Sequence, residues 1–299
     1  MGARLPGPFR SGYVSIIGRP NVGKSTILNA VLGQKISIVS PRPQTTRNRI
    51  MGVKNLDNAQ IIFIDTPGLH RPRTLLGESM VTTVREVLRE IDVVVFVAET
   101  GPRIEQDRLI IGTLDGVDKP VILVINKIDQ LRKAEILRVI DSYRALYPFH
   151  EIIPVSALKN DGVDLLPERI ARCLPEGPKY YPDDLLTDQY ERFMAAEIIR
   201  EKIMERTSEE IPYSVAVEIT DWTEREDGMV SIGAQIYVER EGQKGIIIGG
   251  KGRMLKTVGS LARMEIEGLL GTRVFLQLWV KVRKGWRDDK RMLHDLGYR

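Results

Sequence analysis

Short apolar runs recur along the first half of the chain, and stretches with helical spacing of apolar residues separate them. The runs are YVSIIG, QIIFID, DVVVFVA, PVILVIN and EIIPVS. Apolar runs of this length are typical of strands buried on both faces, and their alternation with helices predicts a parallel sheet. We therefore expect a doubly wound α/β domain over residues 1–176.

The pattern changes after the last of these helices, DLLPERIARCL. The next segment, LPEGPKYYPDD, is rich in proline and turn formers, and it predicts a linker over residues 177–186. Beyond it we expect a helix, two alternating strands, a second helix and a last strand, over residues 189–205, 214–220, 230–238, 253–270 and 272–282. This order predicts an α+β domain over residues 187–299.

The composition is that of a globular protein, with 42% hydrophobic and 28% charged residues among 299. No apolar run is long enough to cross a bilayer, and MGARLPGPFR lacks the apolar stretch of a secretory signal. We therefore expect a cytoplasmic protein. The only cysteine, Cys173, falls in an amphipathic helical pattern, which predicts a buried thiol.

The charges are unevenly placed, although the net charge is only +4. Residues 181–243 contain 6 Lys and Arg against 16 Asp and Glu, whereas residues 244–299 contain 13 against 5. The basic segment also contains the glycine-rich stretch IIIGGKGRM. A glycine loop within a basic segment favours contact with a polyanion over an ordinary solvated face.

A phosphate-binding loop follows the first predicted strand. GRPNVGKS fits the pattern G-x-x-x-x-G-K-[ST], with a strand before it and a helical pattern after it. In such a loop, backbone N–H groups face the β- and γ-phosphates, Lys24 reaches them, and the Ser25 hydroxyl is placed to bind Mg²⁺. The residues assigned to the nucleotide here are Gly18, Arg19, Pro20, Asn21, Val22, Gly23, Lys24, Ser25 and Thr26.

Three further motifs, DTPG, NKID and SAL, each follow a predicted strand, where open α/β sheets bind ligands. Asp65 is placed to hold the metal through water, and the Gly68 N–H to sense a γ-phosphate. Asp129 can accept two N–H bonds from guanine, and adenine lacks that donor pair, so we expect GTP. The Ala157 N–H is placed to meet the guanine O6. The assigned residues are Asp65, Thr66, Pro67, Gly68, Asn126, Lys127, Asp129, Ser156, Ala157 and Leu158.

Together these motifs resemble the translation-factor class of GTPases, and QTTRNR looks like their first switch. The resemblance implies that a threonine there closes on Mg²⁺. Thr46 is our first choice, and Thr45 is the alternative. The implied metal ligands are Ser25, Thr46 and Asp65, and the residues assigned to catalysis are Lys24, Thr46, Asp65, Gly68 and Asn21.

One departure concerns hydrolysis, because many GTPases have a water-orienting glutamine where this chain has Leu69. The chain resembles the group with a hydrophobic residue there, and we expect slow unaided hydrolysis. Some of those relatives use K⁺ held partly by an asparagine of the phosphate loop, which Asn21 matches. His70 is a further candidate base, although a loop histidine is more often solvated.

The stretch GGKG resembles the G-x-x-G turn between two helices of a KH domain, which clamps a nucleic-acid backbone. Its flanking helices, the following strand and the basic surroundings strengthen this interpretation. We expect Trp279, in an alternating strand, to be core and Trp286 to be an exposed stacking residue. The residues assigned to RNA are Gly249, Gly250, Lys251, Gly252, Arg253, Lys256, Lys284 and Trp286.

A phosphate-loop GTPase domain followed by a KH domain, here of type II, resembles the bacterial Era family over nearly the whole chain. The motifs that carry the resemblance are GRPNVGKST, QTTR, DTPGLH, NKID, VSAL, IIGGKG and LWVKVRKGWRDD. The resemblance implies binding of GTP and GDP with Mg²⁺, a monomer, and binding of the 3′ end of 16S ribosomal RNA during small (30S) subunit assembly and maturation. It also implies peripheral contact with the inner face of the cell membrane.

Two alternatives remain open from the residues: an RNA-binding module with a nucleotide-stabilised fold, and a membrane-associated regulatory GTPase. A tRNA-modification GTPase is disfavoured, because the relatives of that class carry a catalytic cysteine near the C-terminus, and Cys173 is the only cysteine here.

Overall fold

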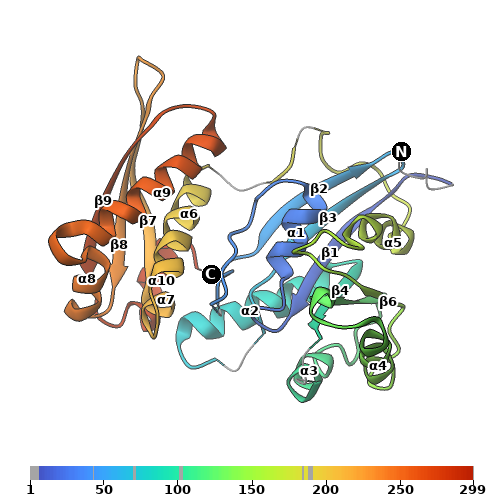
Figure 1. Cartoon of the computed structure of the whole chain (residues 1–299). Helices are drawn as coiled ribbons and strands as arrows, with labels where there is room; N and C mark the ends of the chain where they lie inside the picture. The colour runs from blue at the N-terminus through green and yellow to red at the C-terminus, as the bar shows by residue number, and fades with distance from the viewer. Residues whose placement is uncertain are drawn as a thin grey trace. The chain divides into compact units, whose positions relative to one another are not determined.

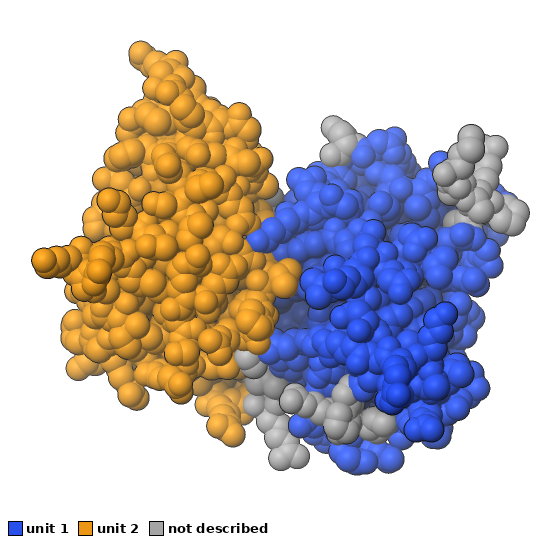
Figure 2. Space-filling model, in the orientation of Figure 1, with its two compact units in different colours: residues 1–37, 46–71, 80–188 blue, residues 38–45, 72–79, 189–299 orange. Residues whose placement is uncertain are grey.

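The computed structural model describes residues 7–42, 44–69, 72–100, 104–183, 185–187 and 191–298. The chain divides into two compact units, made of residues 1–37, 46–71 and 80–188, and of residues 38–45, 72–79 and 189–299 (Figure 2). The break after residue 188 lies close to the predicted start of the second domain. Two short segments, residues 38–45 and 72–79, group with the second unit, so the first unit is not continuous in sequence.

Within the described residues, the first unit is built on a six-stranded sheet in the order β2-β3-β1-β4-β5-β6 (Figure 1). The strands are β1 (Arg10–Gly18), β2 (Ile50–Leu56), β3 (Ala59–Asp65), β4 (Val93–Glu99), β5 (Val121–Asn126) and β6 (Glu151–Pro154). All neighbours pair in parallel except β2, which runs antiparallel to β3. The five expected strands are present, whereas β2 was not predicted. Gly52 and Lys54 interrupt its apolar residues and hide any period.

Helices cover both faces of this sheet (Figure 1). They are α1 (Lys24–Leu32), α2 (Leu75–Glu90), α3 (Ile104–Ile111), α4 (Lys133–Arg144) and α5 (Leu166–Cys173), with short 3₁₀ turns η1 (Ile128–Gln130) and η2 (Val163–Leu165). Phe96 and Leu123 lie in one buried cluster with residues of α2, α3 and α4. Helices α1 and α5 contact β1 and β3. The carboxyl ends of the parallel strands therefore remain open for a ligand.

The predicted linker is held against the first unit in its described part. The Ser11 hydroxyl donates to the Pro178 carbonyl (2.6 Å), and the N–H groups of Tyr180 and Tyr181 donate to Gln60 Oε1 (2.8 and 2.9 Å). Gln60 is fully buried in β3, so its side-chain amide needs such partners. This segment is therefore a strap along the sheet, which its proline-rich composition did not predict.

In its described part, the second unit has a three-stranded sheet in the order β7-β8-β9. Its elements are α6 (Glu191–Arg206), α7 (Ile211–Ser214), β7 (Ala216–Glu224), β8 (Val230–Val238), α8 (Glu241–Ile248), η3 (Gly250–Gly252), α9 (Arg253–Leu270), β9 (Val274–Val282), η4 (Trp286–Asp288) and α10 (Lys290–Asp295). Strand β8 pairs antiparallel with β7 and parallel with β9. Helices α6, α8 and α9 bury a shared core with Ile198, Ile236 and Ile266.

The environments predicted for Trp279 and Trp286 are the reverse of those in the structure. Trp279 is 49% exposed, because Leu278 and Val280 occupy the core-facing positions of β9 and Trp279 points outward. Trp286 is 0% exposed, and its Nε1–H donates to the Ser214 carbonyl (2.9 Å). The assignment of Trp286 to RNA stacking was therefore wrong, since a fully buried ring cannot stack on a base.

Two smaller expectations concern Cys173 and the membrane. Cys173 is half-buried, and burial raises the pKa of its thiol. In the part of the chain that the structure describes, every helix is too short or too polar to span a bilayer.

Candidate functional sites

The phosphate loop joins β1 to α1, and its glycines are required by close neighbours. A Cβ on Gly18 would lie 2.3 Å from the Val97 carbonyl oxygen, and one on Gly23 would lie 2.2 Å from Asn126 Nδ2. Both glycines have positive φ, and Gly23 is the N-cap of α1. The loop therefore points the first N–H groups of α1 toward the carboxyl edge of the sheet, which is an anion-binding arrangement.

Lys24 lies buried beneath this loop. Its Nζ donates to the carbonyls of Gly18 (3.2 Å) and Arg19 (3.0 Å). Burial lowers the pKa of Lys24 to about 8; the charge of Asp65 opposes that shift, and the charge of Arg19 adds to it. A bound phosphate would add negative charge beside this ammonium and favour its protonated form.

All three residues assigned to the metal converge in the structure. The Ser25 hydroxyl donates to Asp65 Oδ2 (2.7 Å), and the Ser25 and Thr46 hydroxyls are 2.9 Å apart. Asp65 is fully buried, and its Oδ1 has no hydrogen-bond partner among the described residues. Burial raises the pKa of Asp65, against the opposing charge of Lys24. Two hydroxyls and an unsatisfied buried carboxylate oxygen fit Mg²⁺, which prefers oxygen ligands.

The two candidate switch threonines have different surroundings. The Thr46 hydroxyl lies with Ser25 and also reaches Asp65 Oδ2 (3.4 Å), whereas the Thr45 hydroxyl donates to the Arg42 carbonyl (2.6 Å). This geometry favours Thr46 as the threonine that approaches the metal.

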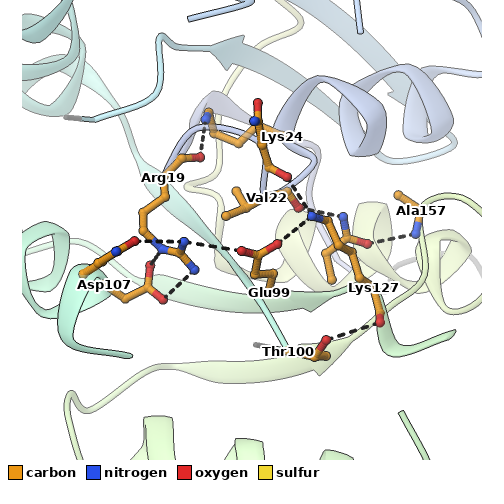
Figure 3. A network of polar contacts seen from close by, with 11 residues as sticks. Arg19, Val22, Lys24, Glu99, Thr100, Asp107, Lys127 and Ala157 are labelled. Atoms are coloured by element: carbon orange, nitrogen blue, oxygen red, sulfur yellow. Dashed lines mark hydrogen bonds and ion pairs between the residues drawn. The ribbon is translucent and has the colours of Figure 1, made fainter. Parts of the chain in front are cut away.

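The expected guanine-binding motifs meet the phosphate loop at the ends of β5 and β6. Asn126 Nδ2 donates to the Val22 carbonyl (2.8 Å), and Asn126 Oδ1 accepts the Ala157 N–H (3.0 Å) (Figure 3). The side-chain amide of one residue at the end of β5 therefore bonds both the phosphate loop and the SAL loop. The Ser156 hydroxyl donates to Asp129 Oδ1 (2.5 Å). The bond from Ser156 orients the Asp129 carboxylate, and Asp129 is an exposed residue.

Lys127 and Leu158 complete this part of the site in different ways. Lys127 has a left-handed backbone, with φ of 67°, and its Nζ donates to the Asn21 carbonyl (2.8 Å). Leu158 is 77% exposed, and only its position in the SAL loop supports its assignment.

The DTPG motif approaches the phosphate loop from β3. The Thr66 hydroxyl donates to the Ile16 carbonyl (2.9 Å), and the Leu69 N–H donates to the Gly18 carbonyl (3.3 Å). A Cβ on Gly68 would lie 2.9 Å from Pro20, so only glycine allows this approach. His70, the candidate base, lies outside the described residues.

The second glycine loop, Gly249–Gly252, turns the chain between α8 and α9. Gly249 and Gly252 have φ of 70° and 75°, and the Gly252 N–H donates to the Gly249 carbonyl (3.0 Å). Lys251, with φ of 55°, stands exposed at the tip, and Arg253 is also exposed. The loop thus presents backbone and a cation to solvent, as the clamping of a phosphodiester backbone requires.

An open groove of about 410 Å³ begins at this loop and runs between α9 and β9. Leu276 and Leu278 supply apolar surface, while Lys256 and Arg263 supply positive charge. The lining residues are Gly252, Leu255, Lys256, Gly259, Ser260, Arg263, Leu276 and Leu278. Lys284 is exposed but is not among these lining residues. Apolar surface with basic groups suits unstacked bases joined by phosphates.

Comparison with known proteins agrees with these two sites. Residues 13–127 match the 50S ribosome-binding GTPase family, and residues 210–287 match the KH domain family. The chain is 57% identical to the GTPase Era of Geobacter metallireducens, over 97% of this chain and 98% of that protein. It is 51% identical to the GTPase Era of Ruminiclostridium cellulolyticum, again over 97% of this chain and 98% of that protein. The chain belongs to the Era family of GTPases.

Solved Era structures share the whole fold. A crystal structure of Era in complex with MgGDPNP and nucleotides 1506–1542 of 16S ribosomal RNA is 45% identical, with a TM-score of 0.93 over 97% of this chain and 99% of that chain. An Aquifex aeolicus Era variant bound to GDP·AlF₄⁻ is 44% identical, with the same TM-score and the same shares. The predicted α/β GTPase domain and KH domain are thus confirmed as those of an Era-family GTPase.

The motifs did not reveal one part of this Era-family nucleotide site. The Arg19 side chain turns away from the phosphate loop toward Asp107 of α3, with 2.6 Å between Nε and Oδ1 (Figure 3). Glu99 contacts Arg19 and Lys127, and the Tyr143 hydroxyl donates to Asp107 (2.6 Å). A sequence signal existed for Glu99, because it is a carboxylate at the carboxyl end of a predicted strand. Asp107 and Tyr143 carried none.

Proposed function

We propose that this Era-family GTPase binds GTP and GDP with Mg²⁺ in its first unit and binds RNA, the 3′ end of 16S ribosomal RNA, with its KH domain. GTP would order the switch, the ordered form would bind RNA during assembly and maturation of the 30S subunit, and hydrolysis would release it. The convergence of Lys24, Ser25, Thr46 and Asp65 beside the guanine loops carries the nucleotide part.

The residues of the first unit have separable roles in this proposal. Ser25, Thr46 and Asp65 would hold Mg²⁺, which supplies positive charge to the β- and γ-phosphates. Lys24 and the N–H groups at the start of α1 bind the same phosphates. Asp129, oriented by Ser156, selects guanine. The Gly68 N–H is placed to sense the γ-phosphate at its close approach to Pro20.

Hydrolysis would be slow without assistance, because Leu69 has no group that can orient water. We include K⁺, held partly by Asn21, as the cation that assists the reaction. The left-handed backbone of Asn21, with φ of 66°, places this residue at the bend of the phosphate loop, which supports that assignment.

The RNA part rests on the glycine loop and the groove beside it. Lys251 and Arg253 are exposed at the loop, and Lys256 lines the groove. The relative whose crystal structure contains nucleotides 1506–1542 of 16S ribosomal RNA shares both domains with this chain. Lys284 remains assigned to RNA as an exposed cation after β9.

The proposal extends to a monomer that works in the cytoplasm and touches the inner face of the cell membrane peripherally. The basic surplus of residues 244–299, 13 Lys and Arg against 5 Asp and Glu, supports contact with anionic lipid. Sedimentation of the protein alone and with anionic vesicles tests the monomer and the membrane contact separately.

The decisive experiment changes Gly250 and Lys251 together to Asp and measures RNA binding and GTP hydrolysis on one preparation. The probe is a fluorescent RNA that corresponds to nucleotides 1506–1542 of 16S ribosomal RNA. We expect the RNA affinity to fall roughly a hundredfold and the salt dependence to flatten by about 0.7 unit of slope per lost phosphate contact. GTP hydrolysis should persist, because the loop lies outside the nucleotide site.

The matched control, Gly268→Asp with Lys290→Asp, changes the net charge equally but away from the loop. A Cβ on Gly268 would meet nothing within 4 Å among the described residues, and both Gly268 and Lys290 are exposed. If both double variants lose RNA binding equally, or neither does, the RNA assignment of the loop is wrong. If the parent binds GTP without turnover, the chain is an RNA-binding module with a nucleotide-stabilised fold.

A further inference from the structure

Glu99 occupies the end of β4 between two cations of the nucleotide site. Its Oε2 is 2.6 Å from Lys127 Nζ, and its Oε1 is 3.4 Å from Arg19 Nη1 (Figure 3). Lys127 belongs to the guanine-binding loop and Arg19 to the phosphate loop. One carboxylate therefore contacts both loops that are expected to hold the nucleotide.

Each cation is also connected to the backbone of the phosphate loop. Lys127 is hydrogen-bonded to that backbone, and Arg19 is itself a residue of the loop. Lys127 Nζ also donates to the Asn21 carbonyl (2.8 Å), and the Arg19 carbonyl accepts the Lys24 ammonium (3.0 Å). A shift of Lys127 or of Arg19 would move the peptide groups of residues 19 and 21. These groups flank the phosphate positions, so the geometry of the loop depends on Glu99.

A buried pair supports the Arg19 side of this network. Asp107 is 0% exposed and accepts hydrogen bonds from Arg19 Nε and from the Tyr143 hydroxyl, both at 2.6 Å. Burial lowers the pKa of Arg19, but the hydrogen bond to Asp107 and the charge of Asp107 outweigh that effect and raise it. Burial, together with the bond to Asp107, raises the pKa of Tyr143, so its hydroxyl remains a donor.

We propose that Glu99 is a positioning residue of the GTP site, which fixes the phosphate loop against the guanine loop through Arg19 and Lys127, with Asp107 and Tyr143 as its buried support. This inference rests on the proposed nucleotide site. Glu99 does not touch the nucleotide in this scheme and acts only through the two cations. GTP and GDP share the guanine and the β-phosphate that the two loops contact, so the loss of Glu99 should weaken both nucleotides.

The test is a double-mutant cycle made of the parent, Glu99→Gln, Lys127→Met and the double variant. Affinities for fluorescent GTP and GDP analogues are measured together with kcat and KM for hydrolysis. We expect Glu99→Gln alone to weaken both nucleotides by about tenfold, as loss of a charge-assisted hydrogen bond should, and to raise KM more than it lowers kcat. In the Lys127→Met background the same change should cost less than about threefold, because one of the two cations it acts through is absent and only Arg19 remains.

Two further variants keep the test independent of folding. Tyr143→Phe removes one hydroxyl from the support of Arg19, and we expect a loss of about threefold in both affinities. Glu105→Gln is the control on the same helix as Asp107; its side chain is 83% exposed and pairs only with Arg108 in the described structure. It should bind both nucleotides as the parent does, and circular dichroism of all variants checks the fold.

Three results would overturn the inference. They are parent-like affinity of Glu99→Gln, effects of Glu99→Gln and Lys127→Met that multiply independently, and a loss confined to GTP. A parent protein that binds neither nucleotide would instead overturn the proposed site itself, so the two failures are distinguishable.

Discussion

The two glycine loops of this chain differ in how their surroundings constrain them. In the phosphate loop, Cβ atoms on Gly18 and Gly23 would collide with neighbouring polar atoms, and Lys24 is buried. In the loop Gly249–Gly252, a Cβ on Gly249 would lie 2.6 Å from Met254 Cβ, but one on Gly252 would meet nothing within 4 Å among the described residues, and Lys251 is exposed. A loop that encloses one small anion must be formed in advance, whereas a loop that a long polyanion passes needs only an accessible backbone and charge.

The difference extends to how the site charges are compensated. Lys24 lies in a buried network with Asp65 and the loop carbonyls, so dissolved salt screens it little. The basic groups of the second loop face solvent, so RNA affinity should depend steeply on salt. Glycines and lysines thus serve a buried phosphate site in one region and a solvent-exposed one in the other.

The largest expected effect comes from Gly23→Ala. Its Cβ would lie 2.2 Å from Asn126 Nδ2 on a backbone with φ of 100°, and strain plus collision should cost about 4 kcal/mol of GTP affinity, roughly a thousandfold. The counterpart, Gly252→Ala, meets no neighbour and should cost only about 1 kcal/mol of RNA affinity from backbone strain. Titrations with GTP and RNA measure both, and similar losses at the two positions would contradict the comparison.

Asp129→Asn should cost about 2–4 kcal/mol of GTP affinity, because a charge-assisted bidentate contact to guanine is lost. The variant should favour xanthosine nucleotides, since the new amide N–H₂ meets an oxygen that guanine lacks. RNA binding without nucleotide should not change. Calorimetric titration with GTP and xanthosine triphosphate checks this, and unchanged GTP affinity would refute the guanine assignment.

Within the second loop, Gly249→Ala and Gly250→Ala should differ. A Cβ on Gly249 would lie 2.6 Å from Met254 Cβ at positive φ, whereas one on Gly250 comes no closer than 3.6 Å to its nearest neighbour, the Arg253 side chain. We expect Gly249→Ala to lower RNA affinity by about 2 kcal/mol and Gly250→Ala by less than about 0.5 kcal/mol. Fluorescence anisotropy with the same RNA measures both, and the opposite ranking would show that loop shape does not set affinity.

The smallest effect concerns the cation. If Asn21 helps to hold K⁺, hydrolysis at saturating GTP should be a few-fold faster in potassium than in sodium buffer, while RNA binding should not distinguish the two ions. Asn21→Ala should abolish the difference. Equal rates for the parent in both ions would reject the potassium role and leave the fold unaffected.

The sequence predicted the elements whose signal is local. The apolar runs that became β3, β4 and β5 are buried along almost their whole length, so most of their residues are apolar, and β1 and β6 carry shorter apolar runs. The helix over 253–270 and the strand over 230–238 agree with α9 and β8 residue for residue, because each has a clear period. Strand β2 lacked one, since its pairing with β3 decides its conformation.

The environments that were missed depend on contacts distant in sequence. Whether Trp279 or Trp286 is buried follows from which face of β9 the helices cover and from the Ser214 carbonyl, 72 residues before Trp286. The contact of Arg19 with Asp107 likewise joins residues 88 apart. Motifs identify the residues that bind a ligand, but they do not identify the residues that position those ligand-binding side chains.

The strap along the first unit also protects the sheet. Strand β2 is the last strand on its side of the sheet, and outside it the Val53 N–H donates to the Leu186 carbonyl (2.8 Å) while the Thr187 hydroxyl donates to the Met51 carbonyl (2.6 Å). An uncovered edge strand invites pairing with other chains and aggregation. A GTPase domain truncated at the predicted boundary, residue 176, would expose the edge of β2. A domain that ends at residue 187 keeps the segment that covers this edge.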